Sequence, residues 1–253
     1  MSYKFKNKTV WITGASSGIG LALAKEMLAH GANVAVSARN KEQLDSIYCQ
    51  YNNALVMAGD LTCLDTNRLI VERIVQKFGT LDCVILNAGG AEYIDISNFS
   101  YLPFKRMMDT NFLSMVKGIE ASLPFLRQSS APYLVGMSSS VAWQGLPKGQ
   151  SYSASKAAIL NLFQGIKIEL ASEKIDVSWI CPGFVKTPLT DKNTFAMPGI
   201  VTVEKAGEII YNKLCRQTTE IHFPKRFTYL LKAISMLPAS WATKILKNTV
   251  PQT

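Results

Sequence analysis

TGASSGIG, residues 13 to 20, follows a short apolar run and precedes a segment with helical spacing at 18–30. Its glycines, Gly14, Gly18 and Gly20, stand where a strand would turn into a helix. Without side chains there, the backbone can approach a pyrophosphate, and the start of the helix offers amide donors and the positive end of its dipole. The turn therefore predicts a dinucleotide site. Its G-x3-G-x-G spacing differs from the common G-x-G-x-x-G, and a purely structural glycine turn is the alternative.

The rest of the chain repeats this alternation of strand and helix. Apolar runs typical of strands occur at 9–13, 33–38, 54–59, 81–87, 133–138, 175–180 and 219–223. Segments with apolar residues at helical spacing occur at 18–30, 40–51, 64–78, 102–127, 152–173 and 203–216. Strand runs that are apolar throughout are typical of a parallel sheet buried on both faces. The pattern predicts an α/β fold, a doubly wound parallel sheet of about seven strands with helices on both faces.

The composition predicts a globular protein that holds no metal. The chain has 253 residues, of which 48% are hydrophobic and 18% charged, which is sufficient for a buried core. The five cysteines are scattered and only two histidines are present, so we expect no metal site. No apolar run is long enough for a signal peptide or a membrane helix, which predicts a reduced, cytoplasmic protein.

The net charge of +9 is unevenly distributed. The segment 225–253 contains five basic residues and no acidic one. Such a balance can indicate nucleic acid, a membrane surface or an anionic ligand. The sequence shows no zinc finger and no RNP-type aromatic motif, so we expect no nucleic-acid partner.

The residue after the second predicted strand bears on the choice of dinucleotide. A carboxylate near this point would accept from the ribose 2′-hydroxyl of NAD. The chain instead has Ala38 and Arg39, and a guanidinium suits a 2′-phosphate. We therefore favour NADP(H), with NAD(H) as the alternative if Arg39 is only a solvated surface residue.

The stretch YSASK, residues 152 to 156, places a tyrosine and a lysine one helical turn apart. An ammonium at i+4 lies on the same face as the phenol and favours the phenolate, which would lower a pKa that is otherwise about 10. Acid–base chemistry is one interpretation of this stretch. The other is a helix N-terminus capped by Ser151 or Ser153.

Taken together, these motifs resemble the short-chain dehydrogenase/reductase family, whose fold is Rossmann-like. The resemblance spans residues 8–200 and rests on TGASSGIG, GDL at 59–61, LNAG at 86–89, YSASK, a serine thirteen residues before its tyrosine, and PGFVKTPL at 182–189. Two features depart from the family pattern. Leu86 replaces the first asparagine of Asn-Asn-Ala-Gly, and the segment after residue 225 does not look like the family core.

The resemblance implies four catalytic residues. Tyr152 would be the general acid in carbonyl reduction and the base in the reverse direction, and Lys156 would lower its pKa and bind the nicotinamide ribose. Ser139 would hold the substrate oxygen, with Ser138 and Ser140 ranked below it. Asn111 would bind a water in the proton relay, and an ordinary polar helix residue is the alternative there.

The resemblance also implies a cofactor site and a substrate pocket. The cofactor would contact Gly14, Ser16, Ser17, Gly18, Ile19, Gly20, Arg39, Asp60, Leu61, Asn87, Ala88, Gly89, Tyr152, Lys156, Pro182, Gly183, Val185 and Thr187. Pocket candidates are Ala91, Val141, Trp143, Gln144, Phe184 and the loop 189–200, which are largely apolar. They favour a lipophilic ketone, aldehyde or secondary alcohol. A non-catalytic dinucleotide sensor or scaffold, and an epimerase or dehydratase, are the alternative functions.

These interpretations divide the chain into a dinucleotide-binding and catalytic domain at 1–224 and a basic amphipathic C-terminal extension at 225–253. The resemblance implies a homo-oligomer, and we favour a dimer over a tetramer because the extension could block or rebuild the face used by tetramers. Apolar residues at i, i+3, i+4 and i+7 from Phe227, with lysines opposite, are typical of an interfacial helix at a membrane. The alternative is that this apolar face packs on the protein as a lid.

Overall fold

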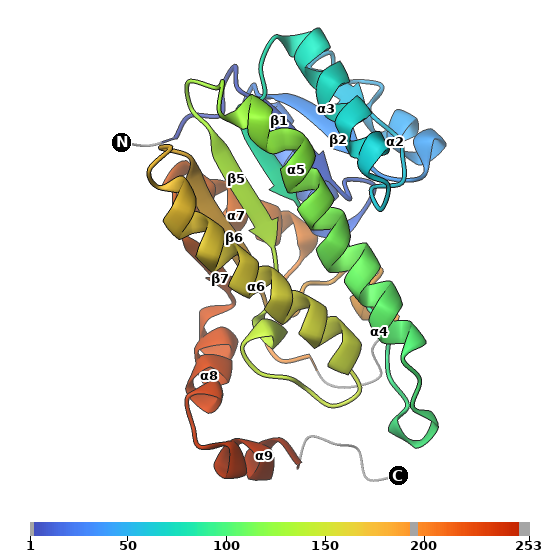
Figure 1. Cartoon of the computed structure of the whole chain (residues 1–253), viewed down its shortest axis with the longest axis vertical. Helices are drawn as coiled ribbons and strands as arrows, with labels where there is room; N and C mark the ends of the chain where they lie inside the picture. Colours follow the sequence, from blue (N-terminus) through green and yellow to red (C-terminus); the bar gives the residue numbers. More distant parts are fainter. Residues whose placement is uncertain (1–2, 193–196, 248–253) are drawn as a thin grey trace.

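The computed structural model describes residues 3–192 and 197–247 (Figure 1). A single seven-stranded sheet forms the centre, in the order β3-β2-β1-β4-β5-β6-β7, and all its pairings are parallel. The sequence-based prediction of a doubly wound parallel sheet is confirmed. The strands are β1 Thr9–Thr13, β2 Asn33–Ser37, β3 Ala54–Val56, β4 Cys83–Leu86, β5 Tyr133–Met137, β6 Asp176–Pro182 and β7 Glu220–Phe223.

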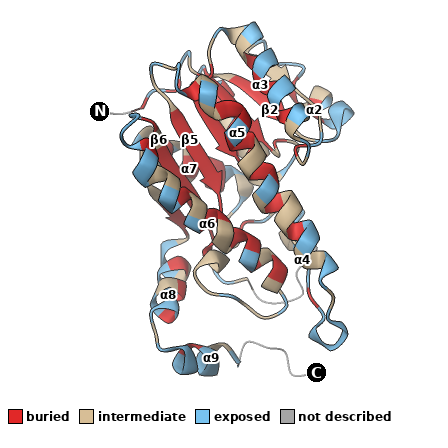
Figure 2. Ribbon diagram, in the orientation of Figure 1, coloured by how far each residue is buried: buried red, intermediate tan, exposed pale blue. Residues whose placement is uncertain are grey.

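Helices cover both faces of the sheet, and the buried strand residues lie between the two helical layers (Figure 2). On one face α1, α2 and α7 share an apolar core, and on the other α3, α5 and α6 share a second one. The main helices are α1 Gly18–Ala29, α2 Lys41–Tyr48, α3 Leu64–Phe78, α4 Leu102–Met107, α5 Ser114–Leu126, α6 Gln150–Leu170, α7 Val203–Cys215, α8 Lys225–Ser235 and α9 Ala239–Lys247.

The strand order reverses beside β1, which pairs with β2 on one side and β4 on the other. In open parallel sheets the connections from such a switch point leave in opposite directions, and a crevice opens at the carboxyl ends of the strands. The glycine turn that follows β1 therefore lies at the place where the fold itself leaves room for a ligand.

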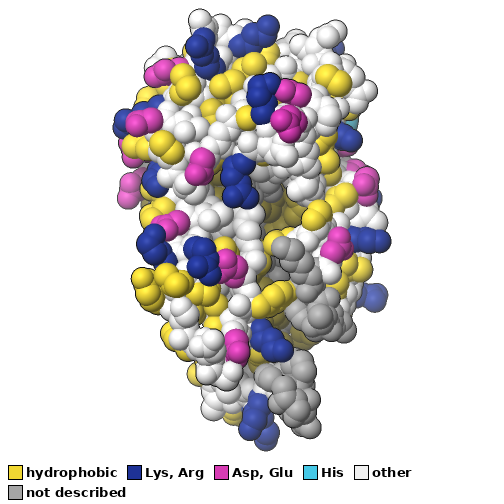
Figure 3. All heavy atoms as spheres, turned by 90° about the vertical axis from the view of Figure 1, so that its right-hand side faces the viewer, with side chains coloured by type: hydrophobic (Ala, Val, Ile, Leu, Met, Phe, Trp, Pro, Cys, Tyr) yellow, Lys and Arg dark blue, Asp and Glu magenta, His cyan; other side chains and the backbone are white. Residues whose placement is uncertain are grey.

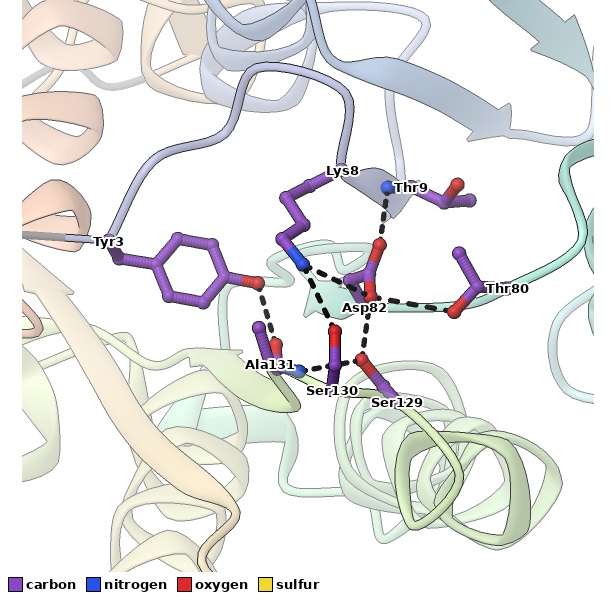
Figure 4. Close-up of polar contacts among 8 residues, drawn as sticks. All are labelled: Tyr3, Lys8, Thr9, Thr80, Asp82, Ser129, Ser130 and Ala131. Atoms are coloured by element: carbon purple, nitrogen blue, oxygen red, sulfur yellow. Dashed lines mark hydrogen bonds and ion pairs between the residues drawn. The ribbon is translucent and has the colours of Figure 1, made fainter.

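The opposite, amino-terminal edge of the sheet is tied together by the buried carboxylate of Asp82 (Figure 4). It accepts hydrogen bonds from the Thr9 backbone N–H at 2.9 Å and the Ser129 hydroxyl at 2.6 Å, and Lys8 lies 3.8 Å away. Tyr3 adds a bond to the Ala131 carbonyl. These contacts join the starts of three neighbouring strands, so this edge has a structural role.

One predicted helix differs from the structure. The uninterrupted helix expected at 102–127 consists of α4, a π-helical segment at Met108–Leu113, and α5. The wider π turn carries Asn111, and the side-chain amide of Asn111 forms two hydrogen bonds with the backbone of Gly90. Single π turns of this kind are frequent at functional sites.

The segment predicted to form a C-terminal extension opens with α8, which begins at Lys225, and the division of the chain at this point stays a prediction. Thr228, Leu231 and Ile234 bury one face of α8 against the body, next to β7. The last part of the predicted extension, 248–253, lies outside the described residues. Within the described chain, no helix has both the length and the apolarity needed to cross a bilayer.

Candidate active site

A cleft of about 670 Å³ opens at the carboxyl ends of the strands, and Figure 3 shows this side of the molecule hollowed near its middle. Every residue predicted to contact the cofactor lines this cleft except Gly20, and Ser139 lines it too. The lining comes from the segments that follow β1, β2, β3, β4, β5 and β6, so residues far apart in the sequence meet at one edge of the sheet.

The glycine turn leaves room for a phosphate group, because its glycine positions tolerate no side chain larger than hydrogen. Gly14 and Gly18 have φ values of +68° and +55°, in the left-handed region. A Cβ on Gly14 would lie 2.8 Å from the Cα of Ala88, and one on Gly20 would lie 2.3 Å from the Gly14 carbonyl oxygen. Gly14 and Gly18 therefore shape the cleft. Gly20 instead permits close packing behind it.

Asn87 holds the glycine turn in place from the neighbouring strand. Its side-chain amide donates to the carbonyls of Thr13 at 2.9 Å and Gly14 at 3.2 Å, while its own N–H bonds to the Thr13 hydroxyl. The family asparagine retained in LNAG thus fixes the end of β1 to the end of β4. Its side-chain donors are used within the protein.

The far end of the cleft is polar and contains Arg39, which is exposed there. Asp60 is the only carboxylate in the described lining. Thr62 donates its N–H and hydroxyl to Asp60, which lowers the pKa of that carboxyl, and the charge of Arg39 lowers it further. The donor set of glycine amides, hydroxyls and a guanidinium suits a dinucleotide with phosphates.

Two residues at this end of the cleft were not predicted from the sequence. Asn40 caps α2 by accepting from the Gln43 N–H, and Gln43 donates to the Ser16 carbonyl at 3.2 Å. Both line the cleft beside Arg39. The signal available was the run of polar residues directly after the second strand.

At the other end of the cleft, burial raises the pKa of Tyr152, and the neighbouring Ser139 hydroxyl lowers it by less, so the net shift is upward. The Ser139 hydroxyl also lies 3.5 Å from the Pro182 carbonyl oxygen. Ser138 is different, because its hydroxyl donates to the backbone carbonyl of Lys156. Among the three consecutive serines, the structure therefore sets Ser139 beside the phenol.

Lys156 is buried, and its ammonium donates to the Met137 carbonyl at 2.9 Å. Burial lowers the pKa of Lys156 to about 8. We expected this ammonium to lower the pKa of Tyr152. Instead the pKa of Tyr152 is raised, because burial disfavours the charged phenolate more strongly than the neighbouring Ser139 favours it.

Asn111 is fully buried behind the cleft and does not line it. Its amide donates to the Gly90 carbonyl and the Ser155 hydroxyl, both at 2.9 Å, and its oxygen accepts from the Gly90 N–H at 2.7 Å. Asn111 thus joins the loop after β4 to α6. Its predicted role with a bound water stays a prediction.

The five residues predicted for the substrate pocket lie beside the cleft and not in its described lining. Val141 and Gln144 line a second groove of about 630 Å³, which α9 closes on the other side. Trp143 lies under Lys232, and the Phe184 ring packs 5.1 Å from Phe227 of α8. Ala91 is half-buried after β4. Their contact with substrate stays a prediction.

Part of the predicted pocket loop 189–200, the segment 193–196, lies outside the described residues. Leu189 and Thr190 line the cleft. The Thr190 hydroxyl donates to the Val185 carbonyl at 2.7 Å, which holds the start of this loop against the cleft.

Comparisons with known proteins agree with this architecture. Residues 8–197 match the family model described as short chain dehydrogenase. The chain is 33% identical to an 11-beta-hydroxysteroid dehydrogenase 1A of Arabidopsis thaliana over 96% of this chain and 76% of that protein. It is 31% identical to an uncharacterized oxidoreductase of Myxococcus xanthus over 94% of each.

A solved short-chain dehydrogenase/reductase from Burkholderia phymatum, in complex with NAD, superposes with a TM-score of 0.84 at 16% identity over 99% of both chains. At that identity the likeness shows the fold alone. The family model and the relatives carry the assignment further. This chain belongs to the short-chain dehydrogenase/reductase family and is an NAD(P)-dependent oxidoreductase.

Proposed function

We propose that this protein interconverts a lipophilic ketone or aldehyde and the corresponding alcohol, with NADP(H) as cofactor. The observation that carries the proposal is that Ser139 and Tyr152 lie beside each other in the lining of the cleft that also contains the glycine turn. A proton donor and an oriented hydroxyl side by side are what a carbonyl oxygen needs as it gains negative charge.

Tyr152 is the proposed general acid. Its phenol would donate a proton to the substrate oxygen, and the Ser139 hydroxyl would hold that oxygen. Since burial raises the pKa of Tyr152, the phenol stays protonated near neutral pH, which favours reduction. When bound, the cofactor would exchange a hydride with the substrate carbon. Lys156 would bind the ribose of the cofactor, and Asn111 holds α6 through its hydrogen bond to Ser155.

NADP(H) is favoured over NAD(H) by the charges at the far end of the cleft. Arg39 is exposed at the cleft wall after β2, where a carboxylate would favour a ribose hydroxyl. Asp60 lies after β3 and already accepts two hydrogen bonds from Thr62. A 2′-phosphate beside Arg39 would therefore meet a positive charge.

A lipophilic substrate is favoured by the side chains around the mouth of the cleft. Leu189 lines the cleft, while Phe184 and Trp143 contact Phe227 and Lys232 of α8. The relative named 11-beta-hydroxysteroid dehydrogenase 1A supports the same class of substrate. A steroid ketone is one member of that class to test.

A turnover screen tests this function. Lipophilic ketones, aldehydes and secondary alcohols are offered with NADPH, NADH and their oxidised forms, and Tyr152→Phe serves as the inactive control. Oxidation of NADPH that depends on a lipophilic carbonyl and on Tyr152 supports the proposal. Dinucleotide binding without turnover of any carbonyl or alcohol would favour the sensor instead.

A homodimer is also proposed, formed through the outward faces of α5 and α6. Ile168 of α6 is 78% exposed, and the small side chain of Ala154 on the same helix leaves room for close approach. Light scattering of the full chain tests the assembly, and Ile168→Glu should shift a dimer to monomer. A stable tetramer would overturn this arrangement.

A further inference from the structure

The exposed apolar side chains of this protein are concentrated at one end. Of the large hydrophobic side chains that are exposed in the described chain, only Leu69, Leu113 and Ile168 lie elsewhere. The others belong to segments that follow the carboxyl ends of β4, β6 and β7, and they are Tyr93, Ile96, Phe99, Tyr101, Leu102, Leu189, Ile200, Tyr229, Leu230, Met236, Trp241 and Ile245.

Two of these segments reach the same extreme of the molecule although well over a hundred residues separate them. The loop that carries residues 93–101 and the helix α9 both lie at the lower end of Figure 1. Figure 2 shows both as mostly exposed. We call the apolar residues of 93–102 and 229–245 together the end surface.

The end surface is too exposed for ordinary packing. Ile96 is 71% exposed and Phe99 61%, while Met236 is 85% and Trp241 65% exposed. Clustered apolar exposure of this kind marks an interaction site. The presence of tyrosines and a tryptophan among these residues is typical of side chains that sit at the boundary between a bilayer and water.

The charges near the end surface indicate which kind of partner it would bind. Residues 225–247 contain five basic side chains and no acidic one. Arg226 and Lys244 are exposed and form no ion pair with any described residue. In the loop, Glu92 pairs with Arg106, whereas Asp95 accepts from Ser97 and keeps its negative charge. The C-terminal half of the end surface is therefore positively charged.

We propose that the end surface docks on an anionic phospholipid bilayer. Ile96 and Phe99 of the loop, and Trp241 and Ile245 of α9, enter the interfacial layer, while Arg226 and Lys244 face the headgroups. Apolar burial supplies the contact and the basic residues supply the preference for anionic lipid. The docking does not depend on the proposed chemistry, although it sets the mouth of the cleft near a source of lipophilic molecules.

Flotation of the full chain with vesicles tests the proposal. The vesicles contain phosphatidylcholine alone or phosphatidylcholine mixed with phosphatidylserine, at low and at physiological salt. We expect the protein to float with the mixed vesicles, to bind neutral vesicles more weakly, and to lose part of its binding as salt rises.

Paired substitutions test the two halves of the end surface separately. Ile96→Ser with Phe99→Ser, and Trp241→Ser with Ile245→Ser, should each lower the partition coefficient about tenfold or more. Leu69→Ser is the matched control, because Leu69 is 53% exposed but lies on α3. It should bind like the unchanged protein.

The charge and depth of contact are tested in the same way. Arg226→Gln with Lys244→Gln should weaken binding to mixed vesicles about tenfold and leave binding to neutral vesicles unchanged. Brominated phosphatidylcholine should quench tryptophan emission, and Trp241→Phe should remove most of that quenching.

Absence of flotation with either vesicle would overturn the proposal, as would normal binding by the loop pair or equal loss in the Leu69→Ser control. Light scattering of the same variants tests whether a second copy of this chain binds the end surface instead. If the paired substitutions convert a larger assembly to a smaller one and vesicle binding is absent, the end surface is an interface between copies of this chain. Circular dichroism and thermal unfolding verify that each variant is folded.

Discussion

The Lys156 ammonium lies 5.7 Å from the centre of the Tyr152 ring and donates its hydrogen bond to the Met137 carbonyl. The two residues lie one turn apart on α6, yet they interact with different groups. The ammonium is bonded to the end of β5, while Ser139 lies beside the phenol. Burial disfavours the charged form of both groups. The cleft therefore holds a neutral phenol beside a lysine whose pKa, about 8, lies below its ordinary value.

Tyr152→Phe removes the phenolic oxygen and leaves the ring. If Tyr152 is the general acid, kcat should fall by about 10³-fold or more with dinucleotide affinity largely retained. Steady-state kinetics and cofactor titration measure the two effects. Tyr229→Phe, on the exposed face of α8, is the control and should keep normal kinetics. Near-normal turnover by Tyr152→Phe would contradict the assigned role.

Arg39→Ala tests the preference for a 2′-phosphate. Loss of a hydrogen bond to a charged group should weaken NADPH binding by about 1.5–3 kcal/mol, with little change for NADH. Isothermal titration with both dinucleotides measures this difference. Lys41→Ala, nearby and paired with Asp45, is the matched control. Equal losses for both dinucleotides, or none, would make Arg39 a solvated surface residue.

Gly20→Ala tests the packing behind the glycine turn. Its Cβ would lie 2.3 Å from the Gly14 carbonyl oxygen and 2.4 Å from the Asn87 amide nitrogen, so the turn must shift. We expect a loss of about 1–3 kcal/mol in the free energy of unfolding, measured by urea denaturation, and weaker dinucleotide binding.

Gly165→Ala is the control for that substitution. Gly165 lies inside α6 and its Cβ would meet nothing within 4 Å. The substitution should raise the free energy of unfolding by up to about 1 kcal/mol, as alanine favours a helix. A Gly20→Ala protein as stable as Gly165→Ala would show that the turn relaxes freely.

His222 should make the protein sensitive to acid. It is buried, and burial followed by the charges of Lys225 and Lys232 lowers its pKa from 6.5 to about 4. Its neutral ring is fully bonded, since the Lys225 ammonium donates to Nε2 and the Thr228 hydroxyl lies 2.8 Å from Nδ1. Protonation would break this arrangement where α8 meets β7.

The direction of this pH dependence follows from the linkage between protonation of His222 and folding. Below pH 6.5 the unfolded chain binds a proton at this histidine and the folded chain does not, so stability falls as pH drops towards 4. The loss should total about 3 kcal/mol, measured by urea denaturation across that range. His222→Gln should reduce the pH dependence. His30→Gln, at the exposed end of α1, should retain it, and identical pH profiles for the two variants would refute the assignment.

Local patterns were enough to predict the sheet and the glycine turn. The runs at 9–13 and 33–38 match β1 and β2 to within one residue, because a strand buried on both faces must be apolar along its length. Gly14 and Gly18 were identified because only glycine occupies left-handed backbone without strain. The helical spacing between Tyr152 and Lys156 likewise placed both on α6.

The break in the helix at Met108–Leu113 was not predictable from periodicity. Met107 and Met115 preserve apolar spacing across the π turn, so the sequence alone resembles one long helix. The break depends on Asn111, whose bonds to Gly90 and Ser155 form only once the loop after β4 and α6 are both in place.

The sequence by itself determined the order of strands and helices, the glycine turn and the helical pairing of Tyr152 with Lys156, because each depends on the spacing of neighbouring residues. Only the tertiary structure decided that Ser139 reaches the phenol while Ser138 bonds to the backbone of α6, and that Trp143 lies against Lys232. It also decided that Phe99 and Trp241 are exposed at the same end of the molecule. Such relationships join residues distant in the chain, and their geometry is set by how the layers pack, which no local spacing encodes.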